Sequence, residues 1–265
     1  MATSNFPTGL LAVWANPGPQ VTTEEFNDWY DNEHVPLRTA HPAFLSAARF
    51  SAFPLAPSLS PSGIRTKPHP EWLALYDVTD EGVFSDESYT TLRANRSPRE
   101  ADVVARVGLL DRRMYTYINE RGKAQALGFG ADGTDATKIG GVITQGFDAD
   151  EENVEGWLDA LGSAATEGSA ETEGWIRTRL FRCGDAGRNG TSVDHNDLTS
   201  RMFPKYLVVH AITRADVVLE FGTIEAQSIP TSPTISALLR VHADKGLADG
   251  LAKDTKDAGG EWAIG

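Results

Sequence analysis

The chain has 265 residues, of which 40% are hydrophobic and 23% are charged, and its formal net charge is −13 at pH 7. This length fits one large domain or two of ordinary size, and the composition is typical of a globular protein rather than a disordered one. The acidic excess leaves no basic stripe for a phosphate backbone, so we expect no nucleic-acid partner.

The N-terminal segment has no basic region before its short apolar run, so residues 9–15 are predicted as a buried strand rather than a signal peptide. No segment approaches the roughly 18 apolar residues of a membrane helix, and we expect no membrane partner. Cys183 is the only cysteine, which excludes an intramolecular disulfide and argues against a thiolate metal site. We expect a cytoplasmic protein.

Residues 21–37 (VTTEEFNDWYDNEHVPL) predict the first helix. Thr22 and Glu25 form a capping box at its start, and Pro36 favours an end near Val35. On a helical projection, aromatic and ionisable side chains share one face: Phe26, Trp29, Tyr30, Glu33 and Leu37, with His34 at its edge. Ionisable groups on an apolar face indicate either a paired structural network or a pocket.

The next elements complete a ferredoxin-like β-α-β-β-α-β order. A long loop rich in proline and serine is predicted over residues 54–70. The predicted elements are strands at 44–53, 71–78 and 113–119, a helical turn or more at 86–95, and a helix at 98–110 that begins at its proline.

The element order then begins again. Residues 123–138 are rich in glycine and are predicted as a linker between a first unit, 1–122, and a second unit, 139–265. The second unit is predicted to have strands at 139–147, 175–183 and 206–212, a helix from Asp148 to about Ala165, a polar loop at 184–201, an amphipathic helix within 234–253, and a fourth strand at 220–226 or 261–264.

A ferredoxin-like sheet has one open apolar face, and two such sheets in one chain can bury these faces against each other. We therefore predict an α+β fold in which two ferredoxin-like βαββαβ units form a pseudo-two-fold barrel. Such a chain can function as a monomer, and a homodimer remains possible.

The stretch WYDNEHVPL, with a predicted strand on either side, resembles the signature of EthD-like members of the dimeric α+β barrel superfamily. The resemblance covers roughly a third of the chain well and elsewhere extends only to element order. It implies that Tyr30 and His34 point into a cavity against a four-stranded antiparallel sheet. The superfamily includes cofactor-free polyketide cyclases, dehydratases, decarboxylases, isomerases and quinone-forming monooxygenases, so the resemblance implies a site more firmly than a reaction.

His34 is the candidate general acid or base, because an imidazole accepts and returns a proton near neutral pH. Tyr30 could hydrogen-bond a substrate carbonyl and stabilise the resulting enolate. Glu33 or Asp31 could orient the imidazole, although adjacent side chains on a helix do not face each other. Arg49 could bind a carboxylate or phenolate. The candidate substrate-binding residues are Trp14, Trp29, Arg49, Trp72, Tyr76 and Tyr115, with Tyr117 a further possibility.

The first predicted helix of the second unit has no counterpart to Tyr30, Glu33 or His34, so we expect catalysis in the first unit. The segment around His195 (DHND) superficially suggests metal ligands, but a solvated loop is favoured because no second histidine follows at helical spacing. His210 lies in an apolar predicted strand, where a hydrogen-bonded core histidine is favoured over a haem ligand.

We therefore expect a cofactor-free enzyme of the lyase or cyclase type, without a metal, that acts on a small aromatic or polyketide-like molecule. Its step would be dehydration, decarboxylation, isomerisation or ring closure. A cofactor-independent monooxygenase, a haem-binding oxidoreductase and a non-catalytic protein that binds a small ligand remain alternatives.

Overall fold

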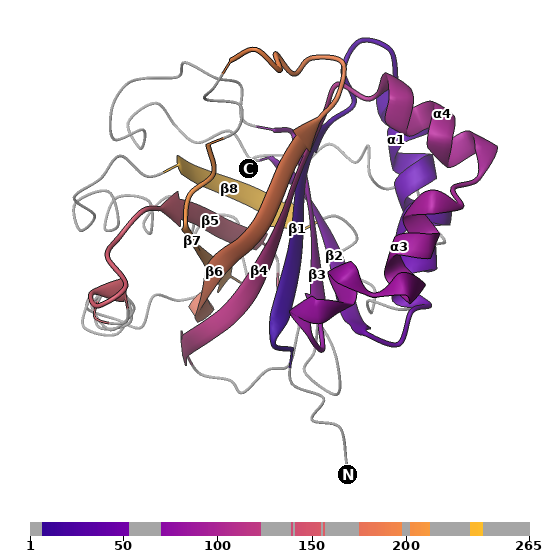
Figure 1. Ribbon diagram of the computed structural model, residues 1–265. Helices are drawn as coiled ribbons and strands as arrows, with labels where there is room; N and C mark the ends of the chain where they lie inside the picture. The colour runs from indigo at the N-terminus through magenta and orange to yellow at the C-terminus, as the bar shows by residue number, and fades with distance from the viewer. Residues whose placement is uncertain are drawn as a thin grey trace.

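The computed structural model describes residues 7–52, 70–122, 139, 141–154, 156, 175–197, 202–212 and 234–240. Within these residues, eight antiparallel strands close into a barrel in the order β1-β3-β2-β8-β5-β7-β6-β4 (Figure 1). The strands are β1 (Gly9–Asn16), β2 (Phe44–Ala52), β3 (Trp72–Val78), β4 (Leu109–Gly122), β5 (Gly141–Phe147), β6 (Trp175–Asn189), β7 (Tyr206–Ile212) and β8 (Thr234–Arg240). Closure pairs every strand on both sides, which removes the exposed edges of an open sheet.

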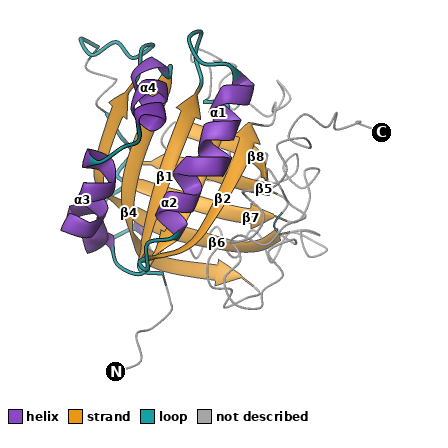
Figure 2. Cartoon of the chain, turned by 90° about the vertical axis from the view of Figure 1, so that its right-hand side faces the viewer, coloured by secondary structure: helices purple, strands orange, loops and turns teal. Residues whose placement is uncertain are grey.

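The helices of the described chain cover the outer face of the first four strands (Figure 2). Side chains of Thr22, Asp86 and Ser97 cap three of these helices by accepting hydrogen bonds from backbone N–H groups. The helical segments are α1 (Thr23–Trp29), the π-helical turn η1 (Tyr30–His34), α2 (Val35–Thr39), the 3-10 helix η3 (Glu81–Ser85), α3 (Glu87–Ala94) and α4 (Pro98–Arg106). None of them is long and apolar enough to cross a membrane.

The first half of the chain has the ferredoxin-like element order that its sequence predicts, with sheet order β4-β1-β3-β2. The second half supplies four strands in the order β8-β5-β7-β6. The two groups join where β2 pairs with β8 and where β4 pairs with β6. The fold is therefore α+β with one continuous, curled antiparallel sheet.

Each face of the first sheet packs against a different partner. Leu10, Ala12 and Trp14 of β1 face the barrel interior, where they join buried side chains of the second half such as Val142 and Val209. The alternate β1 residues face the helices. Because both faces of β1 are buried, its sequence is a continuous apolar run rather than an alternation of apolar and polar residues.

A buried ion pair also connects the two halves inside the barrel. The guanidinium of Arg179 donates to Asp77 at 2.6 Å, and the same carboxylate accepts from the hydroxyl of Ser46 at 2.7 Å. Buried charges need partners of this kind, since leaving one unpaired in a low-dielectric interior costs free energy.

The predicted end of the first helix near Val35 is wrong. The chain passes through Pro36 and continues as α2 to Thr39, after the π-helical turn η1. The wider turn inserts an extra residue and shifts the helical phase, so that Val35 and Arg38 are buried while Leu37 is 41% exposed.

Three further predictions fail for reasons of strand pairing and backbone conformation. The helix predicted over 98–110 ends at Arg106, because Val107 leaves helical geometry and β4 begins at Leu109. The predicted loop after Cys183 begins as strand, since β6 pairs with β4 as far as Asn189. The predicted helix within 234–253 begins as strand β8, which pairs with β5 and β2.

Several other predicted segments fall outside the described residues. They are the loop at 54–70 except its last residue, the linker at 123–138, most of the helix predicted after Asp148, and both candidate fourth strands at 220–226 and 261–264. Among the described strands, β8 occupies the place between β5 and β2 that a fourth strand of the second unit would take.

Two glycines fix the approach between the chain before α1 and the chain after α4. Gly18 has φ +76, and a Cβ built on it would lie 2.6 Å from Cα of Gly108. The N–H of Gly108 also donates to the carbonyl of Pro17 at 2.8 Å.

We expect Gly18→Ala to lower the free energy of unfolding by roughly 1–3 kcal/mol, because alanine is strained at positive φ and its Cβ would collide with the backbone of Gly108. Urea unfolding measures the loss.

Gly187→Ala is the matched control, because a Cβ at this β6 position meets no atom within 4 Å. We expect its unfolding free energy to stay near that of the wild type. Equal stability of the two variants would show that the contact between Gly18 and Gly108 does not constrain the fold.

Candidate functional site

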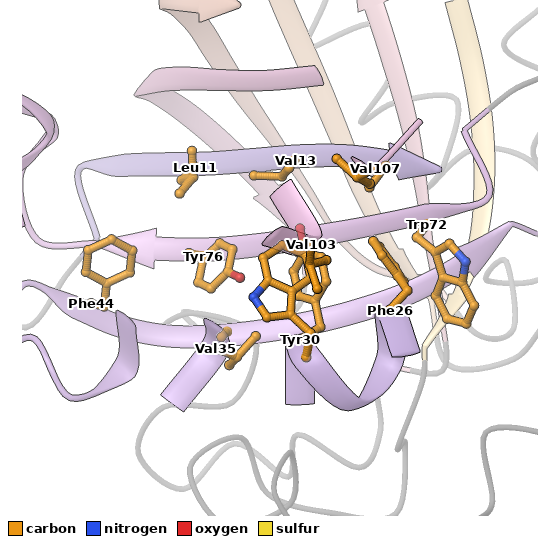
Figure 3. Packing of buried hydrophobic residues seen from close by; sticks show 14 of the residues in the cluster. Leu11, Val13, Phe26, Tyr30, Val35, Phe44, Trp72, Tyr76, Val103 and Val107 are labelled. Atoms are coloured by element: carbon orange, nitrogen blue, oxygen red, sulfur yellow. The ribbon is translucent and has the colours of Figure 1, made fainter. Parts of the chain in front are cut away.

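The first helix presses an aromatic cluster against the outer face of β1, β2 and β3. Figure 3 shows Phe26 and Tyr30 of the helix beside Trp72 and Tyr76 of β3 and Phe44 of β2. The hydroxyl oxygen of Tyr76 lies on the side of its ring that faces Tyr30 in this view. The structure thus brings the helix and one face of the sheet into direct contact around Tyr30.

The π-helical turn determines how Tyr30 and His34 lie together. The N–H of Val35 bonds to the carbonyl of Tyr30, five residues earlier, instead of four. The imidazole ring of His34 lies 5.0 Å from the Tyr30 ring and 4.7 Å from the Trp29 ring, measured between centroids. Single π turns inside α-helices occur frequently at functional sites, and nothing in the sequence pattern indicated this one.

A carboxylate from α4 holds the imidazole. Nδ1 of His34 lies 2.8 Å from Oε1 of Glu100, and Arg38 lies 3.2 Å from the same oxygen. The side chain of Glu100 is 1% exposed, whereas that of His34 is 15% exposed. The imidazole is therefore anchored by a buried carboxylate, while part of the His34 side chain remains exposed.

Sequence reasoning missed Glu100, which is 66 residues from His34. Glu33 and Asp31 were the candidates to orient the imidazole, but the Glu33 carboxylate accepts a hydrogen bond from the hydroxyl of Ser97, and the Asp31 carboxylate pairs with Arg49. A signal was present: Ser97 and Glu100 have the spacing of a capping box. Ser97 does cap α4, while the side chain of Glu100 bonds to His34.

Burial keeps His34 neutral at physiological pH. Desolvation is the largest cause, and with the charge of Arg38 it lowers the pKa of His34 to about 4, although the hydrogen bond that His34 donates to Glu100 acts in the opposite direction. Burial would raise the pKa of Glu100, but the hydrogen bond from His34 and the charge of Arg38 hold it below its usual value. A neutral imidazole that donates from Nδ1 to a carboxylate carries its lone pair on Nε2.

Buried hydrogen-bond donors in the aromatic cluster beside this imidazole lack partners in the part of the chain that the structure describes. Within the described residues, the indole N–H of Trp29 and the hydroxyl of Tyr76 are buried and make no hydrogen bond. Burial raises the pKa of Tyr30 to about 12 and holds the pKa of Tyr76 well above its ordinary value, so both phenols stay protonated. Buried polar groups are normally satisfied, so unpaired donors beside an accessible base indicate a place for an acceptor atom.

Arg49 lies in the same cluster, but its guanidinium is already occupied. It pairs with the carboxylate of Asp31 and donates to Oδ1 of Asn27 at 2.7 Å. Its charge lies over the rings of Tyr30 and Trp72, at 4.7 and 5.1 Å from their centroids. Arg49 therefore fastens the helix to β2, and the structure gives no support to the prediction that it binds a substrate carboxylate.

The structure separates the other predicted substrate-binding residues into two groups. Trp29, Trp72 and Tyr76 lie on the helix side of the sheet with Tyr30. Trp14 and Tyr115 face the barrel interior, as does the partly buried Tyr117, so these three do not line the same site as His34. The β2 register shift between Phe44 and Ser46 also moves side chains relative to the expected alternation.

The two other histidines considered as ligands, His195 and His210, fit the simpler interpretations. His195 is exposed in a turn. His210 is fully buried on β7, with Nδ1 2.6 Å from the hydroxyl of Thr178. Across the described ranges, no three His, Cys, Asp or Glu side chains are arranged to hold a metal ion.

Comparisons with known proteins identify a fold. No family profile matches the chain, and no curated protein sequence matches it. Among solved structures, an anthrone oxidase-like protein has a TM-score of 0.52 at 11% identity, with 94% of this chain and 98% of that chain covered. A protein from Fusobacterium nucleatum provisionally titled a monooxygenase has a TM-score of 0.47 at 11% identity, with 92% and 96% covered. A Listeria monocytogenes ferredoxin-fold protein related to antibiotic biosynthesis monooxygenases has a TM-score of 0.38 at 8% identity, with 91% of this chain and 99% of that chain covered.

The low pKa of His34 predicts how stability changes in acid. The folded-state pKa of about 4 lies below the reference value of 6.5, so the stabilising contribution is complete above pH 6.5 and is lost as the pH falls toward 4. We expect wild type to lose ~2–3 kcal/mol more unfolding free energy than His34→Gln between pH 7 and pH 4.5. Urea titrations of both proteins at the two pH values measure this difference.

Proton NMR gives an independent reading. The Cε1 proton of His34, assigned by its absence from the His34→Gln spectrum, should titrate with a midpoint near pH 4. A midpoint at or above 6.5 would contradict the neutral, desolvated imidazole.

Proposed function

We propose that this chain is an enzyme that removes a proton from a carbon acid, with His34 as the general base. The observation that carries the proposal is the hydrogen bond between Nδ1 of His34 and Glu100, beside an aromatic cluster that contains the unpaired donors of Trp29 and Tyr76. Together these side chains offer a base for the proton and donors for the oxygen on which negative charge develops. The substrate class is a small aromatic or polyketide-like molecule, and none of these side-chain roles requires a cofactor.

We also propose that the chain is a tandem fusion of two ferredoxin-like units, 1–122 and 139–265, joined by a linker at 123–138. The repeated pairing order, β4-β1-β3-β2 and then β8-β5-β7-β6, supports this arrangement. In such a pseudo-two-fold barrel one chain supplies both sheets, so the site next to His34 would be complete in a monomer, and dimerisation would not be needed to build it.

The chemical step begins with transfer of a C–H proton to Nε2 of His34, while the C–H bonding electrons move toward the neighbouring carbonyl. The enolate oxygen would accept hydrogen bonds from Tyr76 and Trp29, with Tyr30 as a further candidate donor. Glu100 is a positioning residue: it selects the tautomer with the proton on Nδ1 and stabilises the imidazolium. Glu33 has no part in the step because it bonds to Ser97.

The fate of the enolate distinguishes the lyase or cyclase from its alternative. In the lyase or cyclase, the imidazolium returns its proton after elimination, decarboxylation, isomerisation or ring closure. In a cofactor-independent monooxygenase, the electron-rich carbanion reacts with dioxygen instead. The fold shared with an anthrone oxidase-like protein supports the cofactor-independent monooxygenase as the second candidate function.

Anthrone is a suitable probe of the first step, because it is a neutral aromatic ketone with acidic methylene hydrogens. Under nitrogen in D₂O, wild type should exchange these hydrogens for deuterium faster than buffer does. His34→Gln should reduce the enzymatic rate by ~10²–10⁴-fold. Glu100→Gln should reduce it by roughly 10–100-fold and lower the pH midpoint of the rate, because Glu100 raises the pKa of His34. Proton NMR follows the exchange.

Asn32→Ala is the matched control. Asn32 is exposed on the same turn and donates to Asp28, away from the imidazole. Its rate should equal that of wild type. If His34→Gln also exchanged at the wild-type rate, His34 would not be the base, and a protein that only binds its ligand would be the better interpretation.

Oxygen consumption separates the two reaction types. In air, the monooxygenase predicts that one O₂ is consumed for each anthrone converted to anthraquinone, with one water released, and that His34→Gln abolishes the enzymatic uptake. The lyase or cyclase predicts proton exchange without oxygen uptake above the buffer rate. An oxygen electrode with absorbance detection of anthraquinone decides between them.

A further inference from the structure

The outer face of the second half also has a buried cluster, far from His34 in the pairing order of the barrel. Phe147 of β5, Leu180 of β6, and Tyr206 and Val208 of β7 pack there with Val154. The rings of Phe147 and Tyr206 stack with centroids 5.6 Å apart. This face is separate from the barrel interior, which the alternate residues of the same strands line.

One amide in this cluster lacks any hydrogen bond. Gln145 is 0% exposed, and both its Oε1 and its Nε2 are buried without a partner. It is directly opposite Val208 in the β5–β7 register, which places it on the same face as the cluster. A glutamine offers an acceptor and two donors, and leaving all of them unused in a dry interior is unfavourable.

A second unused polar atom lies close by in the register. The hydroxyl of Tyr206 is buried without a hydrogen-bond partner. Tyr206 is opposite Phe147, two residues along β5 from Gln145, so Tyr206 and Gln145 are diagonal neighbours on one face of adjacent strands. Diagonal neighbours in antiparallel strands are within reach of one long ligand or of each other's side chains.

The charged and titratable groups described around this face are already engaged. His210 is opposite Ile143 on the same face and bonds through Nδ1 to Thr178. Arg182, opposite Tyr206, is 49% exposed and pairs with Glu151 at 3.0 Å. The ammonium of Lys205 lies over the ring of Tyr206, 5.2 Å from its centroid. The buried polar atoms on which a ligand site can rest are therefore the neutral amide of Gln145 and the phenol of Tyr206, within an apolar and aromatic surround.

We propose that Gln145 and Tyr206 form a second ligand site, which recognises a neutral aromatic compound carrying a carbonyl beside an N–H or O–H donor. The side-chain amide matches such a group with one accepted and one donated hydrogen bond. The apolar part of the ligand packs against the stacked pair of Phe147 and Tyr206. This site does not depend on the base at His34, so it stands or falls independently of the function proposed above.

The probe is 4-fluorobenzamide, whose primary amide pairs with a glutamine amide through two hydrogen bonds. We expect the ¹⁹F signal to shift and broaden in a saturable manner on titration with wild-type protein. Gln145→Leu should weaken binding at least tenfold, and Tyr206→Phe should weaken it by a smaller factor. Methyl 4-fluorobenzoate, which accepts but cannot donate through its ester, should bind more weakly than the amide to wild type.

Controls separate the two sites and test folding. His34→Gln should bind the amide as wild type does. If His34→Gln lost binding while Gln145→Leu retained it, the probe would bind at the first site and the proposal would be overturned.

Gln145→Leu should unfold at or above the wild-type temperature, because it removes a buried amide that has no partner. If that variant does not fold, Tyr206→Phe carries the test, since it removes one unbonded oxygen. Absence of saturable binding to wild type, or equal binding by all variants, would also overturn the proposal.

Discussion

The buried carboxylate of Glu100 is the interaction on which the candidate site depends. It is a buried contact between α4 and the first helix, because His34 and Arg38 both contact its Oε1. A carboxylate at 1% exposure is stable only with such partners: Arg38 supplies the opposite charge and His34 supplies a hydrogen bond. The same contact that anchors the helix layer thereby fixes the tautomer and the direction of the imidazole.

The closed barrel explains why this contact lies outside the strands. Pairing of β2 with β8 and of β4 with β6 turns one face of the first sheet toward the second half, where apolar side chains fill the interior. The opposite face must then be covered by the helices. Trp72 and Tyr76 alternate with Leu73 and Leu75 along β3, so a single strand serves both the interior and the site.

The sequence predicted features set by local pattern and failed on those set by distant contacts. The apolar runs that became β1, β3 and β7 were recognisable because buried strands are continuous in hydrophobicity. The prediction of a helix within 234–253 was wrong for residues 234–240. In a segment of seven residues, apolar positions at Ile235, Leu238 and Leu239 are compatible with a helix or a strand. Pairing with β5 and β2 makes this segment a strand. Tyr30 and His34 were found as neighbours one helical turn apart, whereas Glu100 required knowledge of how α4 packs.

The low pKa of His34 is a property of the free protein and does not make the residue a poor base in the reaction. Protonation without a ligand would place His34 and Arg38, both positive, against the single negative charge of Glu100 in a desolvated interface. Proton transfer from a neutral substrate instead creates an imidazolium and an enolate together, so the interface gains no net charge. The electrostatic cost that lowers the pKa in the free protein is therefore offset when the proton comes from the bound molecule, and the donors of Trp29 and Tyr76 stabilise the anion that remains. A base held neutral by burial, in one cluster with a Tyr76 phenol whose raised pKa keeps it protonated, is suited to a reaction that separates charge within the site.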